Sequence, residues 1–200
     1  MAAIALVLMR RAILLLVLVG ACDDSGLAVD GGVDAGLDAA PAGQGSEPTG
    51  DLLVNEISPR GDGPDWVELH NRGAAPIDLC GYFLTDAADR LDHYFPLGGA
   101  LPPDPCPPLF LEAGGYRVIF LDGTALGTPI DPLHASWKIG PADEVHLVST
   151  TGHTVDGVLF LYPRRPDQPA DVTLSRLPDG DGLFYAAPPS PGLANPAVQP

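Results

Sequence analysis

The sequence predicts an all-β domain, of the sandwich or barrel type, that follows a long segment without a fold of its own. Between residues 52 and 187 the chain consists of short segments rich in β-branched and aromatic residues. Glycine, proline, asparagine and aspartate cluster between these segments, as is typical of turns. No long segment has a helical period free of glycine and proline. These three observations favour about eight or nine strands packed in layers.

Residues 1–21 have the features of a secretory signal peptide. Arg10 and Arg11 precede an apolar run over residues 12–19, and Gly20 and Ala21 follow it. A basic flank, a short apolar stretch and small residues are typical of an exported protein, whereas a membrane-spanning helix needs about 20 uninterrupted apolar residues. Because residues 1–8 carry no charge, Met9 is an alternative start of this signal.

Cys22 stands directly after the signal, at the end of Val19-Gly20-Ala21-Cys22. These four residues resemble a bacterial lipobox, in which the cysteine thiol is acylated and the peptide is cut before it. The resemblance implies that Cys22 binds the lipid bilayer through its acyl chains. The protein would then be exported and anchored in the bacterial cell envelope, on a membrane that the sequence does not specify. An ordinary signal peptide with a cysteine by chance is the alternative.

Residues 22–51 form an acidic linker rich in glycine, alanine and aspartate. This stretch contains no aromatic residue, no lysine and no arginine. Glycine at positions 31, 32 and 36 argues against a helix. Such a segment buries too little apolar surface to offset its ordering entropy. We therefore expect a flexible tether with a root-mean-square span of about 30 Å.

The folded part is predicted to begin at Leu52. The candidate strands are residues 52–58, 65–71, 77–86, 115–122, 144–150, 154–162, 171–177 and 182–187. In the second of them the polar or amphipathic residues Trp66, Glu68 and His70 alternate with Val67 and Leu69, as expected for a half-buried strand. The Asp-Gly pairs of residues 178–182 predict a tight hairpin turn rather than an acidic calcium loop.

The order of motifs over residues 52–195 resembles the lamin tail domain family. The opening of the family is similar to residues 52–86, its middle to 95–98 and 111–120, and its end to 174–185 and 188–195. Residues 99–110 depart from the family pattern and have the character of an insertion. The resemblance implies an immunoglobulin-like β-sandwich over 52–195, with 196–200 as a C-terminal tail. It also implies an interaction module, because the family pattern contributes no catalytic residues.

The motif residues all have structural interpretations. Trp66 and Tyr82 are large amphipathic side chains that suit the sandwich core, and Gly81 suggests a bulge or a close backbone approach. The other positions that match the family motif are Asn55, Glu56, Glu68, Leu79, Arg176, Asp179, Gly180, Pro191, Gly192 and Asn195.

Four further motif residues belong to turns. Asn71 and Gly73 suit a turn with positive φ between two strands. Asp78 and Asp86 are expected to close turns by accepting hydrogen bonds from nearby backbone amides.

The two cysteines of the domain, Cys80 and Cys106, are expected to form a disulfide. Export favours oxidation, and closing the loop between them contributes roughly 3–4 kcal/mol. The bond would fasten the proline-rich insertion to the strand predicted at 77–86. Two free, buried thiols are the alternative.

The remaining chemistry of the sequence excludes several classes of function. A net charge of −16 and a single lysine, Lys138, argue against nucleic acid as a partner. The five histidines lack zinc-ligand spacing, and no Gly-x-Ser-x-Gly nucleophile motif occurs. Five carboxylates are candidate calcium ligands, and the alternative is that they are solvated turn acids. They are Glu56, Asp62, Asp65, Glu68 and Asp86.

These observations predict a monomeric, non-catalytic module that is lipid-anchored in the envelope and binds an envelope or extracellular protein. No cofactor is expected unless calcium binds. The alternatives are a small exported hydrolase and a calcium-dependent adhesion protein.

Overall fold

The computed structural model of the chain describes residues 43–45, 48–59, 64–99, 106–124, 133–161 and 172–197. All of them belong to one compact unit that begins at Leu37. The predictions for the signal peptide, for Cys22, for most of the linker, for Asp62 and for residues 198–200 concern positions outside these ranges. Within the described part of the chain, no helix has the length and apolar character needed to cross a membrane.

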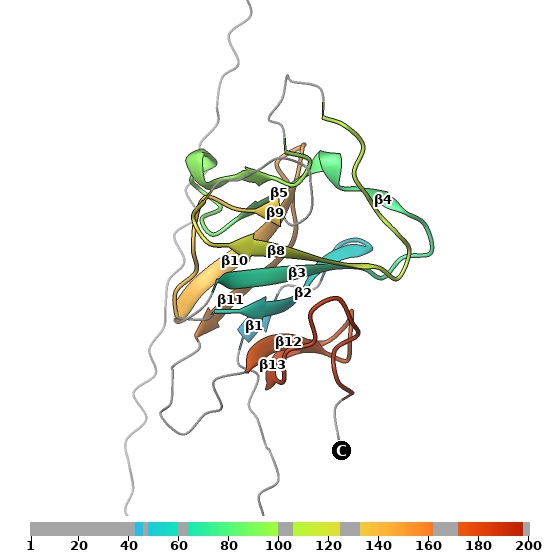
Figure 1. Cartoon of the computed structure of the whole chain (residues 1–200), viewed down its shortest axis with the longest axis vertical. Coiled ribbons are helices and arrows are strands. Elements are labelled where there is room, and N and C mark those ends of the chain that lie inside the picture. Colours follow the sequence, from blue (N-terminus) through green and yellow to red (C-terminus); the bar gives the residue numbers. More distant parts are fainter. Residues whose placement is uncertain are drawn as a thin grey trace, which may run out of the picture. The chain divides into compact units, whose positions relative to one another are not determined.

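The described residues form short strands joined by turns and two 3-10 helices (Figure 1). The strands are β1 (Gly43–Gly45), β2 (Leu52–Ser58), β3 (Asp65–Asn71), β4 (Ile77–Asp78), β5 (Tyr82–Thr85), β6 (Phe95–Pro96), β7 (Phe110–Leu111), β8 (Tyr116–Leu121), β9 (Leu133–His134), β10 (Ala142–Ser149), β11 (Thr154–Leu161), β12 (Thr173–Leu177) and β13 (Leu183–Ala187). The 3-10 helices are η1 (Leu79–Gly81) and η2 (Leu91–His93).

The strands follow the hydrogen-bonded order β6-β5-β10-β11-β1-β13-β12-β2-β3-β8-β9, and β4 pairs separately with β7. All neighbours are antiparallel except β8 and β9, which are parallel. The ribbon of strands folds back on itself, so that β2 lies against β11 and β10. Figure 1 shows β2, β3 and β8 side by side, with β10 and β11 running obliquely to them. These two layers confirm the predicted all-β, immunoglobulin-like sandwich.

One apolar core lies between the layers. Val54, Val67 and Leu69 from the first layer and Leu147 and Phe160 from the second are all buried in it. Burying side chains of this size contributes about 1.5–3 kcal/mol each. Trp66 is also buried, and Tyr82 packs partly buried against the core, as predicted.

The segment predicted as one strand over 77–86 is interrupted. Its first two residues form β4, the next three form η1, and only Tyr82–Thr85 continues as β5. The break occurs because the carboxylate of Asp78 accepts a hydrogen bond from the backbone N–H of Cys80, which begins the 3-10 turn. Gly81 ends that turn, and a Cβ there would meet no atom within 4 Å. The bulge or close approach predicted for Gly81 is therefore wrong.

The fold also begins earlier than predicted. Gly43–Gly45, inside the stretch assigned to the flexible linker, forms β1 and pairs with both β11 and β13. The boundary at Leu52 was wrong because a three-residue strand of glycine and glutamine has no apolar pattern to reveal it.

Candidate functional site

β2 and β3 are buried along their whole length, although both carry polar residues. The alternation of Glu68 and His70 with Val67 and Leu69 predicted a solvated face, and that prediction is wrong. Glu56 and Glu68 are opposite each other in the β2–β3 register, and each is fully buried. The candidate site is this buried polar network, which the C-terminal segment 188–197 covers.

The two carboxylates are bound to the C-terminal segment. Glu56 accepts hydrogen bonds from the N–H of Ser190 at 3.1 Å, from the Ser190 hydroxyl at 3.1 Å and from the Thr173 hydroxyl. Glu68 accepts one from the N–H of Gly192 and a longer one of 3.4 Å from Asn55 Nδ2. Pro191 lies between the two donors and has no N–H of its own. The carboxylates therefore hold a segment that lacks regular secondary structure.

The pKa of Glu68 is unusual. It is raised from 4.5 to about 7, mainly by burial. The hydrogen bonds from Gly192 and Asn55 oppose this rise, and the charges of Glu56 and Asp179 add to it. Near neutral pH, Glu68 therefore exchanges a proton while it lies inside the fold.

Asp179 links three parts of the network. Its Oδ1 accepts hydrogen bonds from Asn55 Nδ2 at 3.0 Å and from the N–H of Asn195 at 2.9 Å. Its Oδ2 accepts a hydrogen bond of 2.6 Å from the hydroxyl of Tyr116. Burial and this bond to Asp179 raise the pKa of the Tyr116 hydroxyl. The carboxylate of Asp179 thus connects β2, β8 and the C-terminal segment.

The turn that carries Asp179 is the predicted hairpin between β12 and β13. Leu177 pairs with Leu183 across it, and Gly180 and Gly182 have φ values of +67° and +83°. The N–H of Gly180 donates to Asn55 Oδ1 at 3.0 Å, so the turn is also anchored to β2.

Asn195 closes the segment over the network. Its Nδ2 donates to the carbonyl oxygens of Asn55 and Arg176 at 3.1 and 3.0 Å. Its Oδ1 lies within hydrogen-bond distance of the Ser190 hydroxyl oxygen, at 3.0 Å. A single amide side chain therefore donates to one backbone carbonyl of β2 and one of β12.

Arg176 and Asp156 form a buried ion pair beside this network. Arg176 Nη2 lies 3.1 and 3.0 Å from the two carboxylate oxygens of Asp156. The same guanidinium donates to the carbonyl oxygens of Val54 and Gly182 and stacks 4.6 Å from the Phe184 ring centroid. Burial raises the pKa of Asp156, and Arg176 and two backbone N–H groups oppose that rise.

The sequence analysis missed Asp156. The signal that identifies it is a single carboxylate in the otherwise apolar strand 154–162, because an acid inside such a strand requires a buried partner. Arg176 was expected only as a motif residue, and the structure supplies its partner.

Asn71 and Gly73 form the predicted turn, for a different reason than expected. Asn71 Oδ1 accepts the N–H of Gly73 at 3.0 Å, and its Nδ2 lies within 3.1 Å of the carbonyl oxygens of Ala75, Leu111 and Glu112. Gly73 is not among the glycines with positive φ. A Cβ at Gly73 would lie 2.6 Å from Asp51 Oδ2, so close packing requires the glycine.

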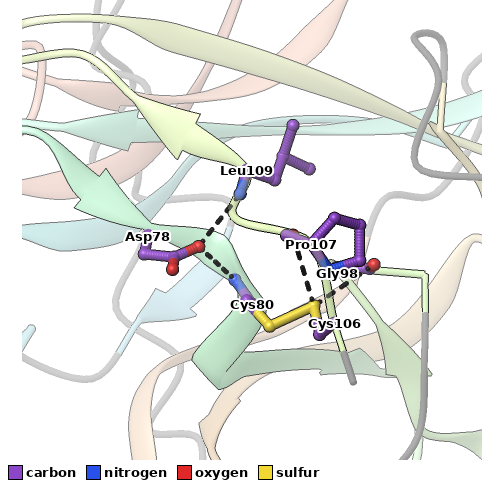
Figure 2. Close-up of a disulfide and its surroundings, with 6 residues drawn as sticks. All are labelled: Asp78, Cys80, Gly98, Cys106, Pro107 and Leu109. Carbon is purple, nitrogen blue, oxygen red and sulfur yellow. Dashed lines mark hydrogen bonds between the residues drawn. A yellow bond between two sulfur atoms is a disulfide. The ribbon is translucent and has the colours of Figure 1, made fainter. Parts of the chain in front are cut away.

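Cys80 and Cys106 form the predicted disulfide, with their Cα atoms 5.9 Å apart. Figure 2 shows how Asp78 supports it: Oδ1 accepts the N–H groups of Cys80 and Leu109, each at 3.0 Å. A Cβ at Gly98 would clash with Cys106 Sγ, so a small residue is required beside the bond. The disulfide fastens the end of the insertion to η1 and to the small β4–β7 sheet.

Asp86 does not close the turn after β5. Its Oδ1 lies 2.6 Å from His93 Nδ1, and the Thr85 hydroxyl accepts the N–H of Ala87 instead. The hydroxyl of Thr85, rather than the carboxylate of Asp86, is placed to accept the hydrogen bond from the backbone N–H of Ala87.

Reducing the disulfide is expected to destabilise the domain by roughly 3–4 kcal/mol, because the bond closes a loop with a sequence separation of 26 residues. Neither cysteine should react with a thiol label in the native protein until a reductant is added, and reduction should lower the melting temperature. Labelling of both thiols in the unreduced protein would contradict this assignment.

Two of the calcium candidates, Glu56 and Glu68, lie opposite each other, but they are not part of a larger group of ligands in the described residues. Among the residues that the structure describes, no group of three histidine, cysteine or carboxylate side chains is placed to hold a metal ion. Asp62 lies outside these residues. Glu56 and Glu68 bind the C-terminal segment, and Asp86 binds His93 on a different part of the fold.

Three histidines, one each on η2, β9 and β10, lie close to carboxylates. His93 contacts Asp86 and His134 contacts Asp122, each at 2.6 Å, and His146 Nε2 lies 3.2 Å from Glu144. His70 has a different role, because its ring stacks on Tyr116 with centroids 4.3 Å apart.

The fold and the site define an antiparallel β-sandwich module whose motif side chains bind one another and the backbone. A family model for the Lamin Tail Domain matches residues 45–160, and the chain belongs to this family. The resemblance predicted from the motifs is thereby confirmed, although the match ends before β12 and β13. No curated protein matches the chain significantly.

Proposed function

We propose that this lamin tail domain protein is a non-catalytic module that is displayed on a lipid anchor and binds a partner protein. The observation that supports the proposal is the use made of the polar motif residues. Asn55, Glu56, Glu68, Asp179 and Asn195 direct their hydrogen bonds into the fold itself. Side chains occupied in this way stabilise a scaffold, and loops or sheet surfaces then bind the partner.

Exposed leucines on β11 and on β13, the strands on either side of β1, are suitable places for that binding. Leu159 and Leu161 of β11 are 59% and 64% exposed, and Leu183 of β13 is 40% exposed. We call these three residues the leucine surface. Apolar side chains at the centre of an interface, with charges at its rim, are the usual anatomy of a protein-binding patch.

The charge of the chain favours a basic partner. With a net charge of −16, the protein repels nucleic acids and anionic polysaccharides and attracts basic proteins. A partner bridged by calcium is the second possibility that this charge favours.

The anchor is tested by replacing Cys22 with alanine. If Cys22 is acylated, the wild-type protein partitions with membranes, and the variant should be released or remain unprocessed because it has no thiol to modify. Fractionation followed by mass analysis of the N-terminus measures both effects. Unchanged membrane partitioning of the variant would show that the protein is not held by a lipid on Cys22.

The binding function is tested by cross-linking the full-length protein to its neighbours in the native envelope at increasing salt. Leu161→Ser should reduce the yield of the cross-linked partner at least several-fold, and salt should reduce it further because charges attract the partner. Leu91→Ser is the matched control, since Leu91 is 81% exposed on η2. Equal losses in both variants would argue against the leucine surface. Salt-insensitive binding to DNA or an anionic polysaccharide would show that the partner class is wrong.

A further inference from the structure

β1 is unusual because it joins two strands that would otherwise not be neighbours. Gly43 is opposite Phe160 of β11 and also opposite Phe184 of β13, and Gly45 is opposite Val158. The end of the linker therefore fills a slot between β11 and β13. This position places it in the middle of the order of strands rather than at an edge.

The slot leaves little room for a side chain at Gly45. In an antiparallel pair, opposite residues point to the same side of the sheet. Position 45 therefore faces the side on which Val158 and Phe184 are buried. A Cβ at Gly45 would lie 3.1 and 3.2 Å from two atoms of the Phe184 ring and 3.5 Å from Arg176 Nη2.

A glycine a few residues further along is under no such restriction. At Gly50 the nearest atom to an added Cβ would be Val155 Cγ1 at 3.8 Å, an ordinary van der Waals distance. The restriction at Gly45 is therefore not shared by Gly50.

We propose that the slot between β11 and β13 favours glycine at position 45 by size, because a larger residue there needs Phe184 to shift, and that pairing of residues 43–45 in this slot docks the linker onto the domain. The docked strand lies against Phe184 and Arg176, and it therefore packs next to the buried Arg176–Asp156 ion pair. This inference deepens the proposed function, because it defines how an anchored linker holds the module, but the docking itself needs no acyl chain.

The docking is weaker than the rest of the sheet. A strand of three residues has few backbone hydrogen bonds, and glycine loses more conformational entropy on ordering than other residues. Segments with few contacts open locally at free energies below that of global unfolding. Undocking of β1 should therefore occur while β2 and β3 remain folded.

Amide hydrogen exchange of the full-length protein tests the proposal. Gly45→Val should accelerate exchange in residues 43–45 at least tenfold and increase exchange in β11 and β13 opposite them. Exchange in β2 and β3 should remain unchanged. Gly50→Val is the matched control and should leave the exchange of β1 unaltered. If Gly45→Val does not fold, Gly45→Ala, which needs only a small shift of Phe184, should give a smaller acceleration at the same amides.

Two results would overturn the docking. One is exchange of residues 43–45 in the wild-type protein at the rate of an unstructured peptide. The other is equal acceleration by the substitutions at Gly45 and Gly50. The Cys22→Ala variant separates this inference from the anchor, because β1 should be protected equally in the presence and absence of acylation.

Discussion

Replacing Arg176 with methionine is expected to destabilise the domain by about 3–5 kcal/mol, which for a domain of this size approaches complete unfolding. The reason is the charge that remains behind. Asp156 is fully buried and accepts two hydrogen bonds from Arg176 at 3.0 and 3.1 Å. Without the guanidinium, the buried carboxylate loses the counter-charge that Arg176 supplies. The carbonyl oxygens of Val54 and Gly182 also lose their donor.

A second substitution separates the lost charge from the lost packing. Asp156→Asn keeps an acceptor for the N–H of Val54, which donates to Asp156 Oδ2 at 2.8 Å, and removes the negative charge. The double variant Arg176→Met with Asp156→Asn should therefore recover a large part of the lost stability. Denaturation by urea measures the free energy of unfolding of each protein.

The surface offers a control for this experiment. Arg90 and Asp92 form an ion pair of 2.7 Å in which both side chains are mostly exposed. Arg90→Met should change the stability little, because exposed pairs gain little and are screened by salt. A loss of stability at Arg90 as large as that at Arg176 would contradict the explanation. So would a double variant no more stable than Arg176→Met alone.

Glu68→Gln is expected to remove a large part of the pH dependence of stability between pH 4.5 and 7. The pKa of Glu68 is raised to about 7 in the folded state, from 4.5 for the ordinary carboxyl. In this range the folded protein binds a proton that the unfolded chain releases. Stability should therefore fall as the pH rises through 7, by about 3 kcal/mol in total at roughly 1.4 kcal/mol per unit of pKa.

The glutamine variant tests this sign directly. Its amide oxygen still accepts the N–H of Gly192, but its side chain does not titrate. Above pH 8 the variant should be more stable than the wild-type protein, and near pH 5 the two should be similar. The two proteins differ only at position 68, so the difference between their melting curves isolates Glu68. Glu112→Gln, at an exposed position, is the control. Parallel curves for the wild type and Glu68→Gln from pH 5 to 8 would refute the assignment.

The strands were largely predictable from the sequence because their signals are local. The predicted limits 52–58 and 65–71 coincide with β2 and β3, and the Asp-Gly hairpin lies between β12 and β13 as expected. Turn residues and β-branched runs mark these elements within a few residues. β1, β6, β7 and β9 were missed because two or three residues carry no period.

The sequence by itself determined the all-β class, the order of the strands along the chain, the pair of cysteines and the family motifs. Only the tertiary structure decided that the polar residues of β3 are buried and which partners they have. Glu56 binds Ser190 across 134 residues, and Val54 binds Asp156 across 102. Periodicity shows which residues share a face of a strand, but what covers that face depends on distant segments. In this protein the C-terminal segment covers the polar residues Glu56 and Glu68, which the local pattern had assigned to solvent. β1 fills the space between β11 and β13, which the local pattern did not predict.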